Sequence, residues 1–416
     1  MNRTEDDKMK AAVFPLRAED AEELAAILGH IGADPRALRY LAPKRRVLHL
    51  FAPDVDYRAA AFIKQELLSR GGDAAVARGV IDGTAHRSGV LMMGTDSQMS
   101  RLLRKMEAMD CWGMKELRAS LGSALLNAGV SRWNLALPGG RRLELNHETK
   151  IMGILNVTPD SFHPDSRVED TDALLSRAGA MLEAGADVLD LGAESTRPGS
   201  SPLPQKEELE RLLPALRALR RAFPEAVLSV DTYKGEVARA AAQEGADIIN
   251  DVGGFSLDEK MLSLAAATGL PCVLSHIAGT PATMQDVPPC DDLMTELCRY
   301  FDEKLRIAEE AGLSRDRIIL DPGLGFGKRA EDNLRILREI DALRVHGLPL
   351  LVGHSRKKFL GAASGAERTE DRLSGTTAVS ALLEGQVSLL RVHDVAENRR
   401  AVLTARAVRG VRPWRA

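Results

Sequence analysis

The chain has 416 residues, 28% of them charged and 44% hydrophobic, with 35 Gly and 19 Pro. This is the composition of an ordinary globular protein, and it excludes a disordered or fibrous chain. The formal net charge is −3, from 56 basic and 59 acidic residues, so no strong field attracts nucleic acid or an anionic membrane. We therefore expect neither partner, and the length predicts two unequal domains.

The N-terminal residues predict no secretion. Met1 to Lys8 carry acidic residues where a signal peptide needs a basic segment followed by an apolar one. No run of 18 apolar residues occurs, so we expect no membrane span. The four cysteines form no C-x-x-C pair, and we expect them to be reduced and the protein to be cytoplasmic.

Residues 1–130 are predicted to form a small α/β domain whose sequence indicates no particular chemistry. Asp54 or Asp56 is expected to cap its central helix, and Thr95 or Asp96 a later one. The expected elements are helices over Asp20–Gly29, Tyr57–Arg70 and Gln98–Met106, a strand over Val47–Phe51, and apolar runs over Ala74–Ile81 and Val90–Met93.

A hairpin is predicted at the start of the second domain, within residues 132–150. Trp133–Leu137 and Arg142–Leu145 flank the turn sequence Pro138-Gly139-Gly140. We place the domain boundary between residues 130 and 131, and we expect the hairpin to close the bottom of the fold that follows.

Residues 131–416 predict a (β/α)8 TIM barrel. Short runs rich in Val, Ile and Leu alternate with longer amphipathic stretches, which is typical of a parallel α/β fold. The helix candidates include Thr171–Glu183, Gln205–Ala222, Lys234–Glu244, Leu293–Ala311 and Arg372–Glu384. The eight strand candidates are Ile151–Val157, Val188–Leu191, Val227–Val230, Ile248–Ile249, Cys272–Leu274, Ile318–Leu320, Leu350–Val352 and Leu389–Val392.

Polar residues follow nearly every predicted strand, at the end where barrel active sites form. One group consists of the acceptors Asp231 and Asp321 and the amide of Asn250, which suit a ligand edge with several N–H donors. A second group is cationic or can become so, and comprises Arg197, Lys357, Arg391 and His393. The two groups together predict a polar heterocycle attached to an anion.

Simpler explanations exist for several of these residues. Asp251 and Asp394 can each be interpreted as a helix N-cap. The run Ser355–Lys358 can be interpreted as a stretch of charge exposed to solvent. The segment Gly323–Lys328 lacks the Ser or Thr that a Walker motif requires, so we expect its glycines to admit a flat ligand, with Phe326 as a stacking face. No histidine spacing predicts a zinc site.

Seven ordered motifs resemble those of the dihydropteroate synthases, over roughly Trp133 to Arg412. They are Asn156–Phe162, Glu194–Gly199, Asp231-Thr232, Asn250–Val252, Asp321–Lys328, Ser355–Lys357 and Arg391–Val395. The resemblance implies that 6-hydroxymethyl-7,8-dihydropterin diphosphate is joined to 4-aminobenzoate with Mg²⁺ present, releasing pyrophosphate and 7,8-dihydropteroate. It also implies a homodimer formed through the last helices of the barrel.

The resemblance also implies a role for each matching residue. The catalytic residues would be Asp231, Asp321, Lys357, Arg391 and His393. The pterin would contact Asp231, Asn250, Asp321, Phe326, Gly353 and Lys357. The diphosphate would contact Asn156, Arg197, Arg391 and His393, with Asn156 also holding Mg²⁺. The aminobenzoate pocket would comprise Phe162, Thr196, Arg197, Pro198 and Lys358.

Three positions depart from the family pattern. The aspartate of the first loop is displaced by one residue, leaving Asp165 as its equivalent. Ser275 replaces a common methionine, which makes one wall of the pterin pocket smaller and more polar. Lys358 stands where a small residue is frequent, and either pairs with the substrate carboxylate or points to solvent.

Two other functions are compatible with a pterin-binding barrel. A pterin-dependent methyltransferase shares the Asp and Asn contacts, but its ligand carries no diphosphate, so the cationic group favours the synthase. A non-catalytic pterin-binding subunit is disfavoured because every expected motif is present.

Overall fold

The computed structural model describes residues 13–16, 18, 20–146, 148–157, 167–194, 202–281, 283–284 and 290–411, with residues 167–170 described by their backbone alone. The chain divides into two compact units: one runs to Gly122 and includes Val411, and the other is Ser123–Gly410. Each unit is described here by itself.

The N-terminal unit is the α/β region expected from the sequence. Its three strands are antiparallel in the order β1-β3-β2, and buried Ile63, Leu67, Met99 and Leu102 come from the two helices that pack on the sheet. The elements are α1 (Ala21–His30), α2 (Leu38–Leu41), β1 (Val47–Asp56), α3 (Tyr57–Leu68), β2 (Asp73–Val76), β3 (Arg87–Thr95), α4 (Asp96–Met106) and α5 (Met114–Asn127).

The structure selects one cap from each pair of candidates. The carboxylate of Asp56 accepts the backbone N–H of Arg58 at the start of α3. Thr95 begins α4 with a reciprocal capping box to Gln98. The apolar run Ala74–Ile81 is a strand only as far as Val76, because residues 78–80 form a 3-10 turn and Ile81 is exposed.

The second unit is a closed parallel barrel, as predicted. Its eight strands follow the order β11-β10-β9-β8-β7-β6-β13-β12, and a parallel bridge between Leu320 and Leu350 joins the first strand of this order to the last. The strands are β6 (Lys150–Asn156), β7 (Val188–Gly192), β8 (Leu228–Asp231), β9 (Ile248–Asp251), β10 (Cys272–Ser275), β11 (Ile318–Asp321), β12 (Leu351–Val352) and β13 (Leu389–Val392).

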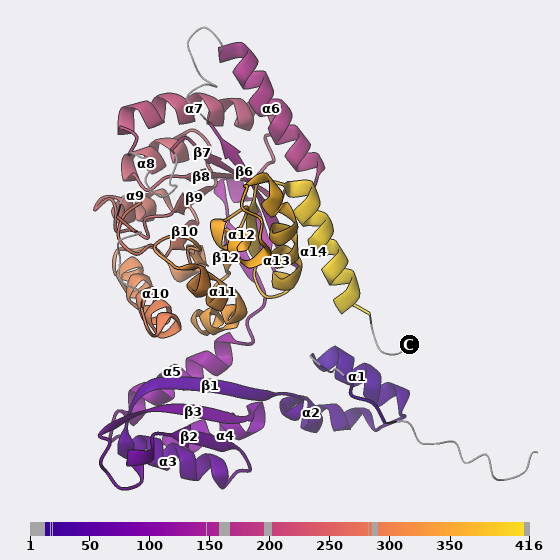
Figure 1. The fold of residues 1–416 in the computed structure, drawn as a ribbon, viewed down its shortest axis with the longest axis vertical. Coiled ribbons are helices and arrows are strands. Elements are labelled where there is room, and N and C mark those ends of the chain that lie inside the picture. Colours follow the sequence, from indigo (N-terminus) through magenta and orange to yellow (C-terminus); the bar gives the residue numbers. More distant parts are fainter. Residues whose placement is uncertain are drawn as a thin grey trace, which may run out of the picture. The chain divides into compact units, whose positions relative to one another are not determined.

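Helices surround the strands of the barrel (Figure 1). They are α6 (Arg167–Glu183), α7 (Gln205–Ala222), α8 (Gly235–Gln243), α9 (Met261–Thr268), α10 (Leu293–Glu310), α11 (Ala330–Arg338), α12 (Lys358–Ser364), α13 (Leu373–Leu383) and α14 (Val395–Arg409). Their inner faces bury Leu, Ile, Val and Ala side chains against the outer faces of the strands in one large apolar cluster. In the part of the chain that the structure describes, no helix is both long and apolar enough to cross a membrane.

The predicted hairpin closes one end of the barrel. Strands β4 (Trp133–Ala136) and β5 (Arg142–Leu145) are antiparallel, and Leu135, Leu143 and Leu145 are almost fully buried. These leucines form a second apolar cluster with residues near the N-terminal ends of the barrel strands, namely Met152, Val188, Ile248, Val273, Ile319, Leu351 and Leu389. The hairpin is therefore the floor of the barrel, and the site must lie at the other end.

Hydrogen bonds at the rim hold this floor in place. Arg141 forms an ion pair with buried Asp247, and Arg317 donates to the carbonyl oxygen of Ala136 at 2.7 Å. Asn127, at the end of α5, donates to the carbonyl oxygen of Val345 at 2.6 Å, so the last turn of α5 belongs to the barrel unit. The division at Gly122 thus lies eight residues before the boundary expected from the sequence.

Truncation of a floor leucine tests the role of the hairpin. We expect Leu135→Ala to lower the free energy of unfolding by about 2–5 kcal/mol, because it leaves a cavity in a packed core. Leu334→Ala, at a position that is 41% exposed on α11, is the matched control and should change it by about 0.5 kcal/mol or less. Equal unfolding free energies for the two variants, measured by equilibrium denaturation, would contradict a floor role.

Candidate active site

The predicted polar residues lie where the strands end opposite the floor. Asn156, Asp231 and Asp321 are the last residues of β6, β8 and β11, and Asn250 and Arg391 lie one residue before the ends of β9 and β13. Gly353 and Lys357 follow β12. Barrel closure therefore brings polar residues from six of the eight strands to the open end of the barrel opposite the floor, which we call the mouth.

Arg391 lies between two carboxylates. Its Nε donates to Asp190 Oδ2 at 2.6 Å, and its Nη2 donates to Asp231 Oδ2, also at 2.6 Å. The two carboxylates raise the pKa of the guanidinium above its ordinary value, although burial acts in the opposite direction. Arg391 is thus a fixed positive charge at the centre of the mouth.

Asp190 is a site residue that the sequence reasoning missed. It is fully buried, and its Oδ2 also accepts from Asn250 Nδ2 at 3.0 Å. It was counted within the apolar run Val188–Leu191. A carboxylate inside a strand with no polar neighbour is the signal that could have identified it.

Burial perturbs both predicted carboxylates. It raises the pKa of Asp231 to about 7, against the attraction of Arg391 and with repulsion from Asp190. Burial likewise raises the pKa of Asp321, opposed by the N–H of Gly323 and by the charges of Lys357, Lys328 and Arg391. The mutual influence of these groups places them in one electrostatic environment.

The glycine-rich segment after β11 places Phe326 beside Lys357, and we call these two side chains the shelf. Lys357 Nζ lies 4.5 Å from the centre of the Phe326 ring, and Gly325 has a φ of +80°. A Cβ on Gly325 would lie 3.5 Å from Lys357 Nζ. The ring and the cation are thus adjacent, as expected of residues that contact a flat ligand.

Lys328 stabilises this segment from within and does not face outward as a phosphate ligand would. Its Nζ donates to the carbonyl oxygens of Gly323 at 2.9 Å and Phe326 at 3.2 Å, and lies 2.8 Å from His276 Nδ1. Burial lowers the pKa of Lys328 to about 7, and burial with repulsion from Lys328 lowers the pKa of His276 to about 3. His276 is therefore neutral and accepts from Lys328.

Ser275 contacts Asp321, and its assignment to a wall of the pterin pocket stays a prediction. Its side chain is fully buried, and its Oγ donates to Asp321 Oδ2 at 3.3 Å. Since the N–H of Gly323 occupies the other carboxylate oxygen at 2.9 Å, Asp321 is held from two sides.

The loops after β12 and β13 are joined to each other. Ser355 Oγ lies 2.9 Å from His393 Nδ1, and Arg356 forms a two-point ion pair with Asp394 at 2.7 and 2.8 Å. The interpretation of Asp394 as a helix cap is wrong, because its side chain makes no capping bond and pairs with Arg356. The run Ser355–Lys358 is likewise not a solvated stretch, although Lys358 at its end is exposed.

The interpretation of Asp251 as a helix cap is wrong, because no helix begins there and α9 starts only at Met261. Its carboxylate instead accepts the N–H groups of Gly253 and Phe255 in the turn after β9, both at 2.7 Å. Burial raises its pKa to about 6, opposed by these two hydrogen bonds.

Asn156 is the candidate metal ligand. A Cβ built on Gly192 would lie 3.9 Å from Asn156 Oδ1 and 3.5 Å from Asp231 Cβ, so these residues of neighbouring strands are adjacent. Among the described residues, no cluster of three His, Cys, Asp or Glu side chains could hold a metal alone. An exposed amide oxygen does suit Mg²⁺, which keeps water and substrate phosphate oxygens as its other ligands.

Phe162, Asp165, Thr196, Arg197 and Pro198 lie outside the described residues. Their assignments therefore stay predictions.

Glu194, the last described residue before positions 195–201, is part of a buried ionic cluster. Lys234 donates to both Glu194 and Glu208, and Thr232 Oγ1 donates to Glu208 at 2.6 Å. Glu194 also accepts the N–H of Leu203 at 3.1 Å. This cluster joins the two described ends of the connection between β7 and α7.

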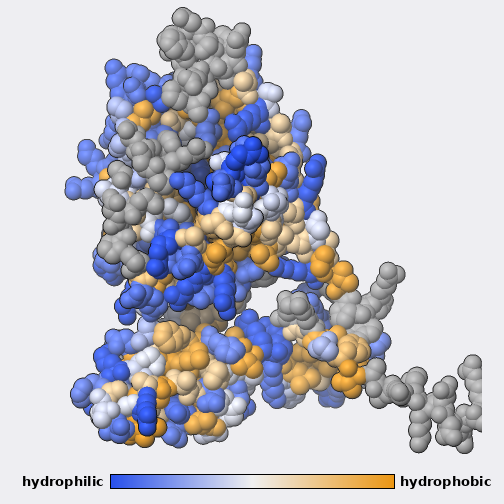
Figure 2. Space-filling view, viewed as in Figure 1, coloured by the Kyte–Doolittle hydropathy of each residue, from blue (hydrophilic) through white to orange (hydrophobic). Residues whose placement is uncertain are grey.

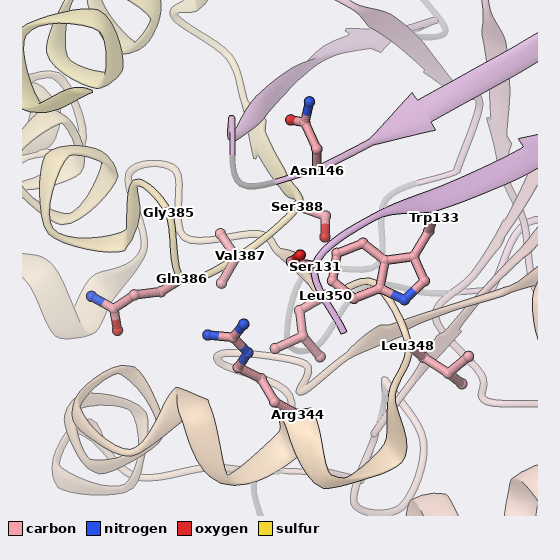
Figure 3. Close-up of a pocket in the computed structure, with 10 residues that line it drawn as sticks. All are labelled: Ser131, Trp133, Asn146, Arg344, Leu348, Leu350, Gly385, Gln386, Val387 and Ser388. Carbon is pink, nitrogen blue, oxygen red and sulfur yellow. The ribbon is translucent and has the colours of Figure 1, made fainter. Parts of the chain in front are cut away.

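A pocket at the floor is distinct from the mouth. Figure 3 shows it beside the hairpin, and its lining residues include Trp133, Arg344, Leu350 and Val387. Its volume of about 10 Å³ is no more than one water molecule requires. It is not a candidate substrate site.

A closed barrel whose mouth combines buried carboxylates, an amide, a guanidinium and an aromatic shelf defines a class of enzymes that bind a polar heterocycle. The model of the family described as pterin binding enzyme matches residues 152–393, which is more than half of the chain. The chain therefore belongs to the pterin-binding enzyme family.

The relatives within this family are dihydropteroate synthases. The enzyme of Escherichia coli strain K12 is 42% identical over 270 residues, covering 64% of this chain and 94% of its own length. A probable bifunctional folylpolyglutamate synthase/dihydropteroate synthase of Halobacterium salinarum is 38% identical over 362 residues. That match covers 85% of this chain and 42% of the relative, so the chain spans less than half the length of this protein.

Solved structures of the same enzyme share the barrel. The dihydropteroate synthase of Xanthomonas albilineans with 4-aminobenzoic acid is 39% identical, with a TM-score of 0.61 over 68% of this chain and 100% of that one. Its complex with 7,8-dihydropteroate gives a TM-score of 0.58 at 36% identity, over 67% and 99% of the chains. The family resemblance inferred from the motifs is confirmed.

Substitution of Lys328 tests its burial in the glycine-rich segment. The lowered pKa means that between pH 7 and 10 the unfolded state binds more protons at this position than the folded state, so the wild-type chain gains stability as pH rises. Lys328→Met should lose this gain, which is at most about 1.4 kcal/mol per pH unit. The measurement is urea denaturation at several pH values.

Lys206→Met, at an exposed position on α7, is the control and should follow the wild-type pH profile. A Lys328→Met profile parallel to the wild type would show that Lys328 is charged and solvated in the folded state.

Proposed function

We propose that the chain is a dihydropteroate synthase, which joins 6-hydroxymethyl-7,8-dihydropterin diphosphate to 4-aminobenzoate and releases pyrophosphate. The observation that carries this proposal is the convergence of Asp231, Asp321 and Arg391 in one buried mouth, within hydrogen-bonding or electrostatic reach of one another. The relatives with this name support the same reaction.

The acceptor side of the mouth fits the pterin. Asp231 and Asp321 offer carboxylate oxygens to its N–H donors, and Asn250 offers an amide. Phe326 and Lys357 form a shelf for the flat ring. These groups would also stabilise positive charge that develops on the pterin during the reaction.

The cationic side fits the diphosphate. Arg391 is fixed at the centre of the mouth, and His393 is held by Ser355. Asn156 would help to hold Mg²⁺, which would neutralise negative charge on the leaving group. The aminobenzoate residues and the pairing of Lys358 with the substrate carboxylate stay predictions.

The proposed bond changes are those that the family resemblance implies, and the charges of the mouth are compatible with them. The bond between the pterin methylene carbon and the diphosphate oxygen breaks, and its electron pair leaves with pyrophosphate. The aniline nitrogen then attacks the methylene carbon and afterwards loses its proton. Because the attacked carbon is cationic, no strong general base is required.

The reaction is tested by pyrophosphate release in the presence of dihydropterin diphosphate, 4-aminobenzoate and Mg²⁺, with dihydropteroate identified by mass. Release should depend on 4-aminobenzoate. Asp321→Asn should lower kcat/KM roughly hundredfold, since it removes a charge that acts in the transition state. Asp341→Asn, at an exposed position near the floor, is the control and should retain wild-type kinetics.

A different result would contradict this assignment. Pterin binding without turnover would favour a non-catalytic subunit, and methyl transfer to a corrinoid protein would favour the methyltransferase.

We also propose that the chain forms a homodimer through α13 and α14. Leu382 is 67% exposed, Leu403 44% and Val408 72%, and Figure 2 shows apolar colour over this part of the barrel. Exposed apolar side chains on neighbouring helices are typical of a subunit interface.

Light scattering after size-exclusion chromatography tests the dimer. We expect a dimeric wild-type chain and a monomeric Leu382→Glu variant, because the new carboxylate would be buried at the interface. Ile81→Glu, at a position that is 83% exposed in the N-terminal unit, should leave the dimer intact. A monomeric wild type would overturn the proposal.

For the compartment, the cytoplasm stays a prediction. One relative, from Arabidopsis thaliana, is named as mitochondrial.

A further inference from the structure

The ion pairs of Arg391 leave one carboxylate far more accessible than the other. The Asp190 side chain has no exposure, whereas the Asp231 side chain is 12% exposed at the mouth. A ligand entering the mouth can therefore reach Asp231 but not Asp190. Any competition for Arg391 must occur at its Nη2 bond to Asp231, while its Nε bond to Asp190 stays in place.

The burial of Asp190 lowers the stability of the folded state. Its Oδ1 is buried and has no hydrogen-bond partner among the described residues, and a buried acceptor without a donor destabilises the folded state. Its Oδ2 meanwhile holds two residues, Arg391 and Asn250. Such an arrangement is expected where the carboxylate serves a site at the expense of stability.

We propose that Arg391 is an exchangeable counter-ion: anchored by Asp190, it passes from Asp231 to the diphosphate when the heterocycle takes its place on Asp231. Asp190 is then the positioning residue that keeps the guanidinium and the Asn250 amide in place during this exchange. The inference rests on the proposed function. It adds that binding of the heterocycle at Asp231 and binding of the diphosphate at Arg391 are coupled.

The coupling follows from the charges. Without ligand, Asp231 Oδ2 accepts from Arg391 Nη2, so the N–H donors of the heterocycle compete with Arg391 for the negative charge of this carboxylate. This competition weakens the ion pair of Arg391, and an anion bound to the guanidinium compensates for the weakened pair. Each ligand thus reduces the cost of binding the other, and the effect is equal in both directions.

Gly353 lies beside the stem of Arg391. It follows β12, and a Cβ at this position would lie 3.9 Å from Arg391 Cβ and 4.0 Å from Arg391 Cδ. A side chain longer than one carbon would therefore meet this stem, and glycine avoids that contact.

Calorimetric titration of the full chain tests the exchange. The probes are magnesium pyrophosphate and 6-hydroxymethylpterin, which lacks the diphosphate. In the wild type, saturation with the pterin should tighten pyrophosphate binding at least fivefold. Asp231→Asn should tighten pyrophosphate binding by a similar factor without pterin, because a neutral amide holds Arg391 Nη2 more weakly than a carboxylate does.

Asp321→Asn is the matched control. It removes one negative charge from the same mouth, but from a residue that does not hydrogen-bond to Arg391 in the described structure. It should tighten pyrophosphate binding less than Asp231→Asn does, because it relieves general repulsion of the anion without loosening a hydrogen bond to Arg391.

The outcomes separate the inference from the proposed function. Binding of both ligands without mutual effect, or equal gains in Asp231→Asn and Asp321→Asn, would overturn the exchange and leave the synthase assignment intact. Failure of the wild type to bind either ligand would overturn both. If Asp231→Asn does not fold, the wild-type coupling measurement still decides.

Discussion

Closure of the barrel is the constraint on which the site depends. Eight short strands end within one mouth, so charged residues at those ends cannot be solvated separately. Asp190 is fully buried, and Asp231 and Arg391 are largely so, with 12% and 21% of their side chains exposed. Loss of any one of the three would leave a charge without its partner. The electrostatics of the mouth is therefore a property of the whole ring of strands.

The same constraint explains why each loop at the mouth is fixed by its own hydrogen bonds or ion pair. Lys328 is held by backbone carbonyl oxygens, Asp321 by an N–H and a hydroxyl, and Arg356 by Asp394. Each contact fixes a loop that carries a residue of the mouth. The loops are thus ordered by interactions directly behind the residues that face the ligand.

Much of the barrel could be predicted from the sequence. The predicted bounds of α7 and β13 coincide with those observed, because strong apolar periodicity ends there at polar or turn residues. The hairpin floor was predicted from its turn sequence. Less could be predicted in the N-terminal unit, where β1 continues through Pro53 as an edge strand and α5 buries only Met114 and Leu121.

The site residues were predicted where polarity marks the end of a strand, as for Asp231, Asn250 and Asp321. Asp190 was missed because it lies inside a strand, and the pairing of Asp394 with Arg356 joins residues 38 positions apart. Such pairings depend on the closed barrel, and the only local signal is the isolated carboxylate of Asp190 within an apolar run. Only the fold reveals that a cap candidate is an ion-pair partner.

The hairpin floor has a consequence for how this barrel can be combined with other domains. Because Leu135, Leu143 and Leu145 come from the barrel unit itself, the barrel carries its own closure and needs no preceding domain to cover its core. The Escherichia coli relative, which matches over 64% of this chain, and the much longer Halobacterium salinarum relative share this barrel with different amounts of sequence outside it. The floor thus makes the N-terminal end of the barrel unit a permissive point of fusion.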